Sequence, residues 1–334
     1  MELTPRMEPR AVESTPFTEV WSRKAGRGFG GAVAQSDTVI YFGASDRHVI
    51  AVDLRNGAQR WSARMQGPLA EGVAIDSVRA YAVSERPDGR AYGIDLSRGT
   101  KSWDRQVGFP SSAPVLADGM LIISTRRGVV QGLQPSSGIV AWRRVLGVVR
   151  APAYITSPGE IIIATTDSLF RIATATGKVL DRKRSPGAVL SGWASSAQFR
   201  IAGTTDSVVV GMLPDSLSVA WSVRLDAPVI GTPIVRGDTA YAITRVGSLY
   251  HIRLGGTPAA ERILSLKTPF IASPVMFRDW IVAGSADGVL YGFNLDGSIA
   301  WQITIAGPIE LSPLVLSDGF LAIGGRGDLH RYRL

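Results

Sequence analysis

Apolar residues along this chain come in short runs that glycine, proline or aspartate bound on both sides. Residues 273–301 are typical, because they divide into four β-rich runs at 273–277, 280–284, 289–294 and 298–301. Such runs, separated by turn residues, predict short antiparallel strands. No window of a dozen residues repeats apolar positions at helical spacing without an interrupting glycine, proline or β-branched run. We therefore expect an all-β protein.

The tryptophans mark a repeat of about forty residues. Six of them recur in phase: Trp21, Trp61, Trp103, Trp142, Trp221 and Trp301. The two long intervals, of 79 and 80 residues, are doubled periods, and they place the missing markers at Asp181 and near Glu261. A glycine precedes the marker by four residues at Gly57, Gly99, Gly138, Gly177 and Gly297. Four strands per repeat predict a β-propeller blade, in which these tryptophans pack neighbouring blades together.

Two further features keep the same period. A small residue followed by proline opens the first strand of five units, at Pro114, Pro152, Pro233, Pro274 and Pro313. A tight turn recurs eight times, at residues 45–46, 88–89, 127–128, 166–167, 205–206, 246–247, 287–288 and 326–327. We expect the turn residues Asp46, Asp167, Asp206 and Asp287 to form hydrogen bonds within their turns rather than to bind a metal.

The number of units predicts how the ring closes. Units ending at residues 61, 103, 142, 181, 221, 261 and 301 give seven complete blades, and residues 302–334 supply three further strands. The segment Phe17–Trp21 matches the last strand of the other units. We therefore predict a single eight-bladed propeller over residues 16–334, in which the N-terminal strand completes the last blade and leaves no free edge at the seam. Residues 1–15 are predicted to form a flexible tail that is mobile or binds a partner.

Composition narrows the chemistry. The 334 residues (35.6 kDa) are 45% apolar and 19% charged, which is typical of a globular chain, and no apolar run is long enough to span a bilayer. The absence of cysteine excludes disulfides, thiolate metal sites and cysteine nucleophiles. The net charge of +8 is spread along the chain, with one dense cluster at residues 182–184, and we expect no nucleic-acid partner. His48, His251 and His330 fall in different units, so no metal site or cofactor is expected.

The repeat resembles the quinoprotein-type (PQQ-like) propeller repeat, whose pattern runs strand, Gly-Ser-x-Asp-Gly, strand, Ala-x-Asp, Thr-Gly, Trp. Residues 37–61 and 279–301 carry this pattern. Within that superfamily the eight units, the chain length and the opening segment Phe17–Gly30 resemble the BamB family. The resemblance implies a non-enzymatic, periplasmic scaffold that docks on the barrel-insertion subunit of the outer-membrane β-barrel assembly machinery. It also implies that membrane association comes through a partner or a lipid anchor outside this chain.

The resemblance also indicates where a partner would bind. In that family the docking surface includes a leucine-rich segment ending in arginine and, in the next blade, a pair of aspartates. These align with Gly187–Trp193, where Ser191 replaces the arginine, and with Pro228–Pro233, which contains no acid.

We expect partner contacts at three residues of the first segment, Leu190, Gly192 and Trp193. An exposed tryptophan beside glycine is a suitable interface anchor, and packing in the core is the alternative for Trp193. We also expect the blade-turn residues Arg126 and Arg127 to face an acidic partner. The other tryptophan outside the repeat phase, Trp280, is expected to pack in the core.

Other functions fit the same repeat. One is a scaffold subunit of a different envelope complex, and another is a small-molecule or sugar-binding propeller that uses its central funnel. A quinone-dependent dehydrogenase is a further alternative. Such enzymes are nearly twice as long, typically carry a vicinal disulfide that this chain cannot form, and would place inward-facing acids or amides on one face. We expect a protein without enzymatic activity.

Overall fold

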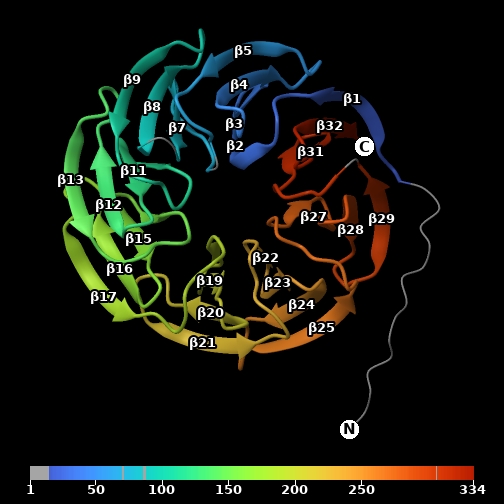
Figure 1. Cartoon of the computed structure of the whole chain (residues 1–334). Coiled ribbons are helices and arrows are strands. Elements are labelled where there is room, and N and C mark those ends of the chain that lie inside the picture. The colour runs from blue at the N-terminus through green and yellow to red at the C-terminus, as the bar shows by residue number, and fades with distance from the viewer. Residues whose placement is uncertain (1–14, 70, 86–87, 306) are drawn as a thin grey trace, which may run out of the picture.

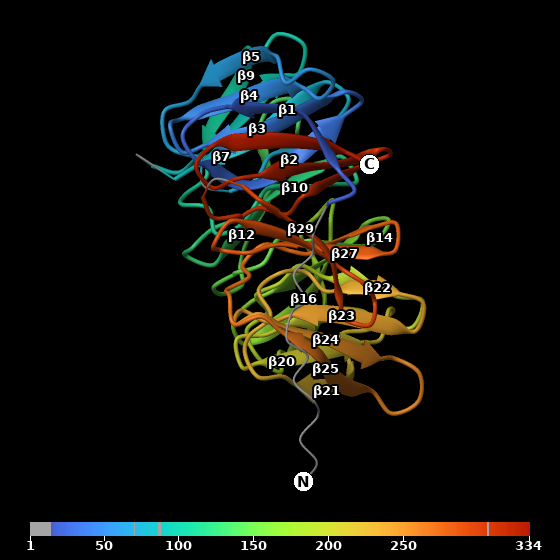
Figure 2. The ribbon, with the colours of Figure 1, turned by 90° about the vertical axis from the view of Figure 1, so that its right-hand side faces the viewer.

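The computed structural model describes residues 15–69, 71–85, 88–305 and 307–334. Eight four-stranded antiparallel sheets form a closed ring (Figure 1), which Figure 2 shows from the side as a thick disc. Every regular element in these residues is a β-strand, so none of them forms a helix that could cross a membrane. The prediction of an all-β, eight-bladed propeller is confirmed. The tail predicted at residues 1–15 lies, apart from Thr15, outside the described residues.

The strands follow one another from the ring centre outward within each blade. Blade 1 contains β2 (Phe29–Ser36), β3 (Val39–Ala44), β4 (His48–Asp53) and β5 (Gln59–Arg64); blade 2 contains β6 (Ala74–Ile75), β7 (Arg79–Ser84), β8 (Arg90–Asp95) and β9 (Lys101–Gln106). Blade 3 contains β10 (Val115–Ala117), β11 (Met120–Ser124), β12 (Val129–Leu133) and β13 (Val140–Val145); blade 4 contains β14 (Tyr154–Ser157), β15 (Glu160–Ala164), β16 (Ser168–Ala173) and β17 (Val179–Arg184).

The second half of the ring repeats this order. Blade 5 contains β18 (Ala194–Ser195), β19 (Arg200–Gly203), β20 (Val208–Met212) and β21 (Val219–Arg224); blade 6 contains β22 (Ile234–Arg236), β23 (Thr239–Ile243), β24 (Ser248–Arg253) and β25 (Ala259–Ser265). Blade 7 contains β26 (Val275–Phe277), β27 (Trp280–Gly284), β28 (Val289–Phe293) and β29 (Ile299–Thr304); blade 8 contains β30 (Leu314–Leu316), β31 (Gly319–Ile323), β32 (Asp328–Arg333) and β1 (Thr18–Lys24).

Each tryptophan of the repeat packs on the next blade. Trp142 is 6% exposed and lies over Gly177, where an added Cβ would stand 2.5 Å from the indole ring. Its Nε1 donates a hydrogen bond to the carbonyl oxygen of Thr174 at 2.8 Å. Trp21, Trp61 and Trp103 make the equivalent bond to the turns of blades 1, 2 and 3. The glycines Gly57, Gly99, Gly138 and Gly177 are therefore the sockets for the tryptophans of the preceding blades, whereas Gly297 packs against Ile263.

The interface between blades 4 and 5 lacks this pair and is filled in another way. Asp181 stands where blade 4 would present its tryptophan, and Leu217 of blade 5 stands where the glycine socket would lie. Leu217 is 1% exposed and belongs to the apolar cluster between these blades. Trp193 packs in the same cluster. The large side chain thus comes from the opposite side of the interface.

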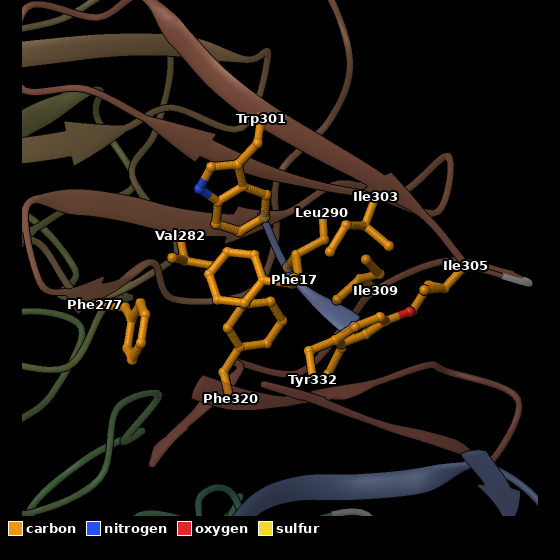
Figure 3. Close-up of a cluster of buried hydrophobic side chains, with 11 residues drawn as sticks. Phe17, Phe277, Val282, Leu290, Trp301, Ile303, Ile305, Ile309, Phe320 and Tyr332 are labelled. Carbon is orange, nitrogen blue, oxygen red and sulfur yellow. The ribbon is translucent and has the colours of Figure 1, made fainter. Parts of the chain in front are cut away.

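The ring closes where the sequence predicts. Strand β1 pairs antiparallel with β32, so that residues 18–24 complete blade 8. Phe17, four residues before Trp21, occupies the position that glycine holds in other blades, and its ring centroid lies 4.8 Å from those of Trp301 and Phe320 (Figure 3). An aromatic side chain at the seam therefore replaces the usual turn. Trp280 packs at the edge of this cluster, 5.9 Å from Phe17 between ring centroids.

Candidate protein-interaction surface

Eight loops around the ring centre connect the outermost strand of one blade to the innermost strand of the next (Figure 1). We call them the axial loops. They contact one another directly: the backbone N–H of Thr232 donates to Ser273 Oγ at 2.8 Å, and the N–H of Ser273 donates to Ser312 Oγ at 3.1 Å. This chain of contacts joins the loops of blades 6, 7 and 8 into one continuous surface.

Three consecutive axial loops present an aliphatic side chain at the same position. Leu190, Ile230 and Ile271 each lie four residues before the first residue of β18, β22 and β26, and each is half-buried. We call these three residues the axial patch. The residues just before them, Val189, Val229 and Phe270, are buried at 1–3% exposure. Burial of one residue fixes each loop, so that the next side chain lies at its surface.

Charged residues flank the axial patch. Arg150 holds the equivalent position before β14, and Glu310 holds it before β30; both are exposed. At this position the axial loops are therefore apolar in blades 5 to 7, with a cation on one side and an anion on the other. Exposed apolar patches that are bordered by charged residues are typical of protein-binding surfaces.

The departure of Ser191 from the family pattern has a structural cause. Ser191 is 1% exposed, its Oγ accepts a hydrogen bond from the Gly203 N–H at 2.8 Å, and the hydroxyl donates to the Gly192 carbonyl oxygen at 2.7 Å. The loops pack closely at this position, where Ala151 and Gly231 occupy the neighbouring units and are also buried. An arginine here would have to leave the interior, so the serine holds the loop instead of meeting a partner.

Trp193 is buried, which agrees with packing in the core and contradicts the prediction of an exposed anchor. It is 7% exposed, it packs between blades 4 and 5, and its ring centroid lies 6.1 Å from that of Tyr154. It is out of phase with the other tryptophans but in phase with the strand-opening Pro233, forty residues later, which is also buried. Because position 181 carries no tryptophan, the Trp193 ring fills the space between blades 4 and 5. Leu190 and Gly192 remain half-buried.

The structure does not bring the two arginines to the axial patch. Arg126 and Arg127 lie at the exposed turn between β11 and β12 in blade 3, whereas Leu190 precedes blade 5. Arg126 forms an ion pair with Glu85 of blade 2. Arg127 borders an open cavity of about 490 Å³ together with Phe109. The two arginines therefore remain only a predicted partner contact.

One acidic residue near Arg126 has a raised pKa. Glu71 precedes blade 2 in an axial loop, and its burial raises its pKa to about 7. Arg126 opposes this rise and Glu85 adds to it. Elsewhere the histidines pair singly with acids, as in His48–Asp46 at 3.2 Å and His251–Glu261 at 2.9 Å. Across the described ranges no group of three or more acids and histidines is arranged to hold a metal.

Family comparison identifies the repeat. The sequence model described as "Outer membrane protein assembly factor BamB" matches residues 10–147, 45–211 and 171–329, which together span most of the chain. The chain belongs to this family. A BamB from Yersinia pestis is 24% identical over 97% of this chain and 91% of its own length. A BamB from Moranella endobia is 24% identical over 84% of this chain and 79% of its own length.

Solved structures agree on the fold. The crystal structure of BamB from Moraxella catarrhalis superposes with a TM-score of 0.83 at 16% identity, covering 95% of this chain and all of that one. The quinohemoprotein alcohol dehydrogenase from Comamonas testosteroni superposes with a TM-score of 0.73 at 12% identity, covering 95% of this chain and 76% of the enzyme. The same propeller therefore occurs in BamB and in an enzyme, so function has to be argued from the surface.

Sequence reasoning missed two members of the axial patch. Ile230 and Ile271 lie one and two repeat units after Leu190, at intervals of 40 and 41 residues. A comparison of the residues four positions before each innermost strand would have found them.

Proposed function

We propose that this protein is a non-enzymatic scaffold for outer-membrane β-barrel assembly and that it binds a protein partner through its axial patch. The BamB family supports this proposal, because its model and its relatives carry the description "Outer membrane protein assembly factor". The same descriptions support a location in the cell envelope. We further propose a periplasmic position at the outer membrane, with the barrel-insertion subunit of the assembly machinery as partner.

The observation that carries the proposal is the aliphatic side chain repeated in three adjacent loops. Leu190, Ile230 and Ile271 are half-buried in loops whose backbones are fixed by buried neighbours. A rigid surface of this kind loses little conformational entropy when it binds. Burial of aliphatic side chains at the centre of such a surface supplies the affinity. The flanking Arg150 and Glu310 would set the orientation of the partner.

The test measures binding of the purified barrel-insertion subunit from the same bacterium to the immobilised full chain. We expect Ile230→Arg to weaken binding by at least tenfold, because it places a charge inside the apolar patch. The control is Val78→Arg, a valine 51% exposed at the turn between β6 and β7, at the other end of the strands. The control should bind as the unmodified protein does.

Equal binding by both variants would reject the axial patch as the contact surface. If the barrel-insertion subunit fails to bind the unmodified chain, the scaffold would belong to another envelope complex. Stabilisation of the unmodified chain by a sugar or a quinone in a thermal shift assay would instead favour a small-molecule function.

A further inference from the structure

The outer rim of the disc has an uneven charge distribution. Strands β13 and β17, which are neighbours on the rim (Figure 1), carry five exposed cations. One of them, Arg182, donates hydrogen bonds to Ser168 Oγ and lies over the Phe170 ring. The other four are Arg143, Arg144, Lys183 and Arg184. We call these four residues the rim cations. Among the residues that the structure describes, none of the four lies within 4.0 Å of a carboxylate. The corresponding strand of blade 7, β29, contains no charged residue.

Exposed aliphatic side chains accompany the rim cations. The exposed fraction of the residue is 53% for Ile139, 43% for Val140, 76% for Val145, 38% for Val179 and 39% for Leu180. All five lie on β13 or β17 or directly before β13. Strand β13 therefore presents two arginines and two valines to solvent within six residues.

Protection of the sheet edge does not account for this pattern. Charged residues on outer strands do prevent pairing with other chains. However, β29 ends its sheet without any charge. Exposed valines on β13 act against such protection, because apolar residues on an edge strand promote association. The combination of cations and aliphatic side chains indicates a surface that binds something.

We propose that the rim formed by β13 and β17 binds edge-on to the surface of a bilayer that contains anionic phospholipids. Unpaired arginine and lysine side chains are attracted to anionic headgroups. Aliphatic side chains between them can enter the interfacial region, as they do in interfacial helices. The edge of a disc is convex and can lie along a flat surface over two adjacent blades. The axial patch, at the ring centre, would stay free for a protein partner.

The test is sedimentation of the full chain with vesicles made of equal parts phosphatidylcholine and phosphatidylglycerol. Each cation near such a surface changes the partition coefficient by about fivefold. We therefore expect the combined variant R143Q/R144Q/K183Q/R184Q to lower the partition coefficient by about 100-fold or more. Binding of the unmodified protein should fall as salt is raised, and it should be absent with vesicles of phosphatidylcholine alone.

The matched control removes the same charge from four other blades. The variant K24Q/R64Q/R105Q/R224Q changes exposed cations on β1, β5, β9 and β21. It should keep most of the binding, whereas an equal loss in both variants would show that net charge alone causes it and would overturn the proposal. Equal binding to vesicles of phosphatidylcholine alone, or no binding by the unmodified protein, would also overturn it.

A single change tests the aliphatic contribution. Val145→Ser should weaken binding to the anionic vesicles several-fold and leave its dependence on salt unchanged, because it removes an apolar contact and no charge. An unchanged partition coefficient would contradict insertion of β13. Circular dichroism and the melting temperature of each variant should match the unmodified protein, because all five side chains are exposed.

Discussion

The seam of the ring offers the sharpest test of how the fold is held together. Phe17 is 6% exposed, and its ring lies 4.8 to 5.9 Å from four other aromatic rings, between centroids. Phe17→Ala removes these contacts and leaves a cavity between blades 7 and 8. Truncation of a buried phenylalanine to alanine costs about 3–5 kcal/mol in the free energy of unfolding.

The size of the expected effect in a thermal melt follows from the chain length. The entropy of unfolding for 334 residues is about 0.7 kcal/mol/K, so a loss of about 4 kcal/mol lowers the melting temperature by about 6 °C. Differential scanning calorimetry measures this shift, and urea unfolding gives the free energy independently. Hydrogen exchange of the β1 amides should speed up as well, because Phe17 immediately precedes this strand.

The control is a phenylalanine of the same size at an exposed position. Phe109 is 38% exposed beside an open cavity, so Phe109→Ala should lower the free energy of unfolding by about 1 kcal/mol or less. A similarly small effect of Phe17→Ala would refute the interpretation that an aromatic side chain closes the ring in place of a turn.

Three other changes test interactions inside the ring. Asp53→Asn should lower the free energy of unfolding by about 2–3 kcal/mol, because the 3% exposed carboxylate accepts hydrogen bonds from two arginines. These bonds lower the pKa of Asp53, so their contribution to stability is present above about pH 4 and is lost as the pH falls. Urea titrations at several pH values measure this contribution. Gly138→Ala should lower the melting temperature by several degrees, because the new Cβ would lie 2.5 Å from the Trp103 ring at a φ of +69°. A calorimetric melt that matches the unmodified protein would contradict the claim that Trp103 needs a glycine at position 138. Glu71→Gln should raise the free energy of unfolding by about 1 kcal/mol or more at pH 8 and leave it unchanged below about pH 4, where Glu71 is protonated in both states. The reason is that the raised pKa, about 7, makes ionisation of Glu71 costly in the folded state, and an equal gain at both pH values in urea unfolding would contradict this cause.

The architecture could be predicted from the sequence because each repeat unit forms one blade. The spacing of the tryptophans predicts the number of blades, and the match of Phe17–Trp21 to the other outer strands predicts the closure by β1. The prediction that Trp193 is an exposed anchor was wrong, and its alternative of core packing was right; the phase that Trp193 shares with Pro233 points to the buried position. The ion pair between Arg126 and Glu85 joins two blades, and no pattern within one repeat could have indicated it.

The packing of neighbouring blades also explains why the repeat is imperfect. Four of the tryptophans require a glycine in the next blade, as Trp142 requires Gly177, whereas Trp301 packs against Phe17. At Asp181, where the tryptophan is missing, Leu217 and Trp193 of the next blade supply the missing volume. Near Glu261, the other missing marker, Ile263 of the same blade packs on Gly297. The sequence constraint therefore acts on pairs of adjacent units rather than on each unit alone.

Within the axial loops, the residues that hold the ring together are different from the residues that face a partner. In the axial loops before blades 4 to 8 one buried side chain, such as Val229, secures the backbone, and the next, such as Ile230, lies at or near the surface. Substitution of the second residue changes the chemistry of the surface without changing the packing of the blades. Ser191 belongs to the buried set, so the missing arginine at that position alters no exposed contact of this protein. Partner choice in such a ring depends on about one exposed residue per loop, which is why proteins with the same fold can serve different partners.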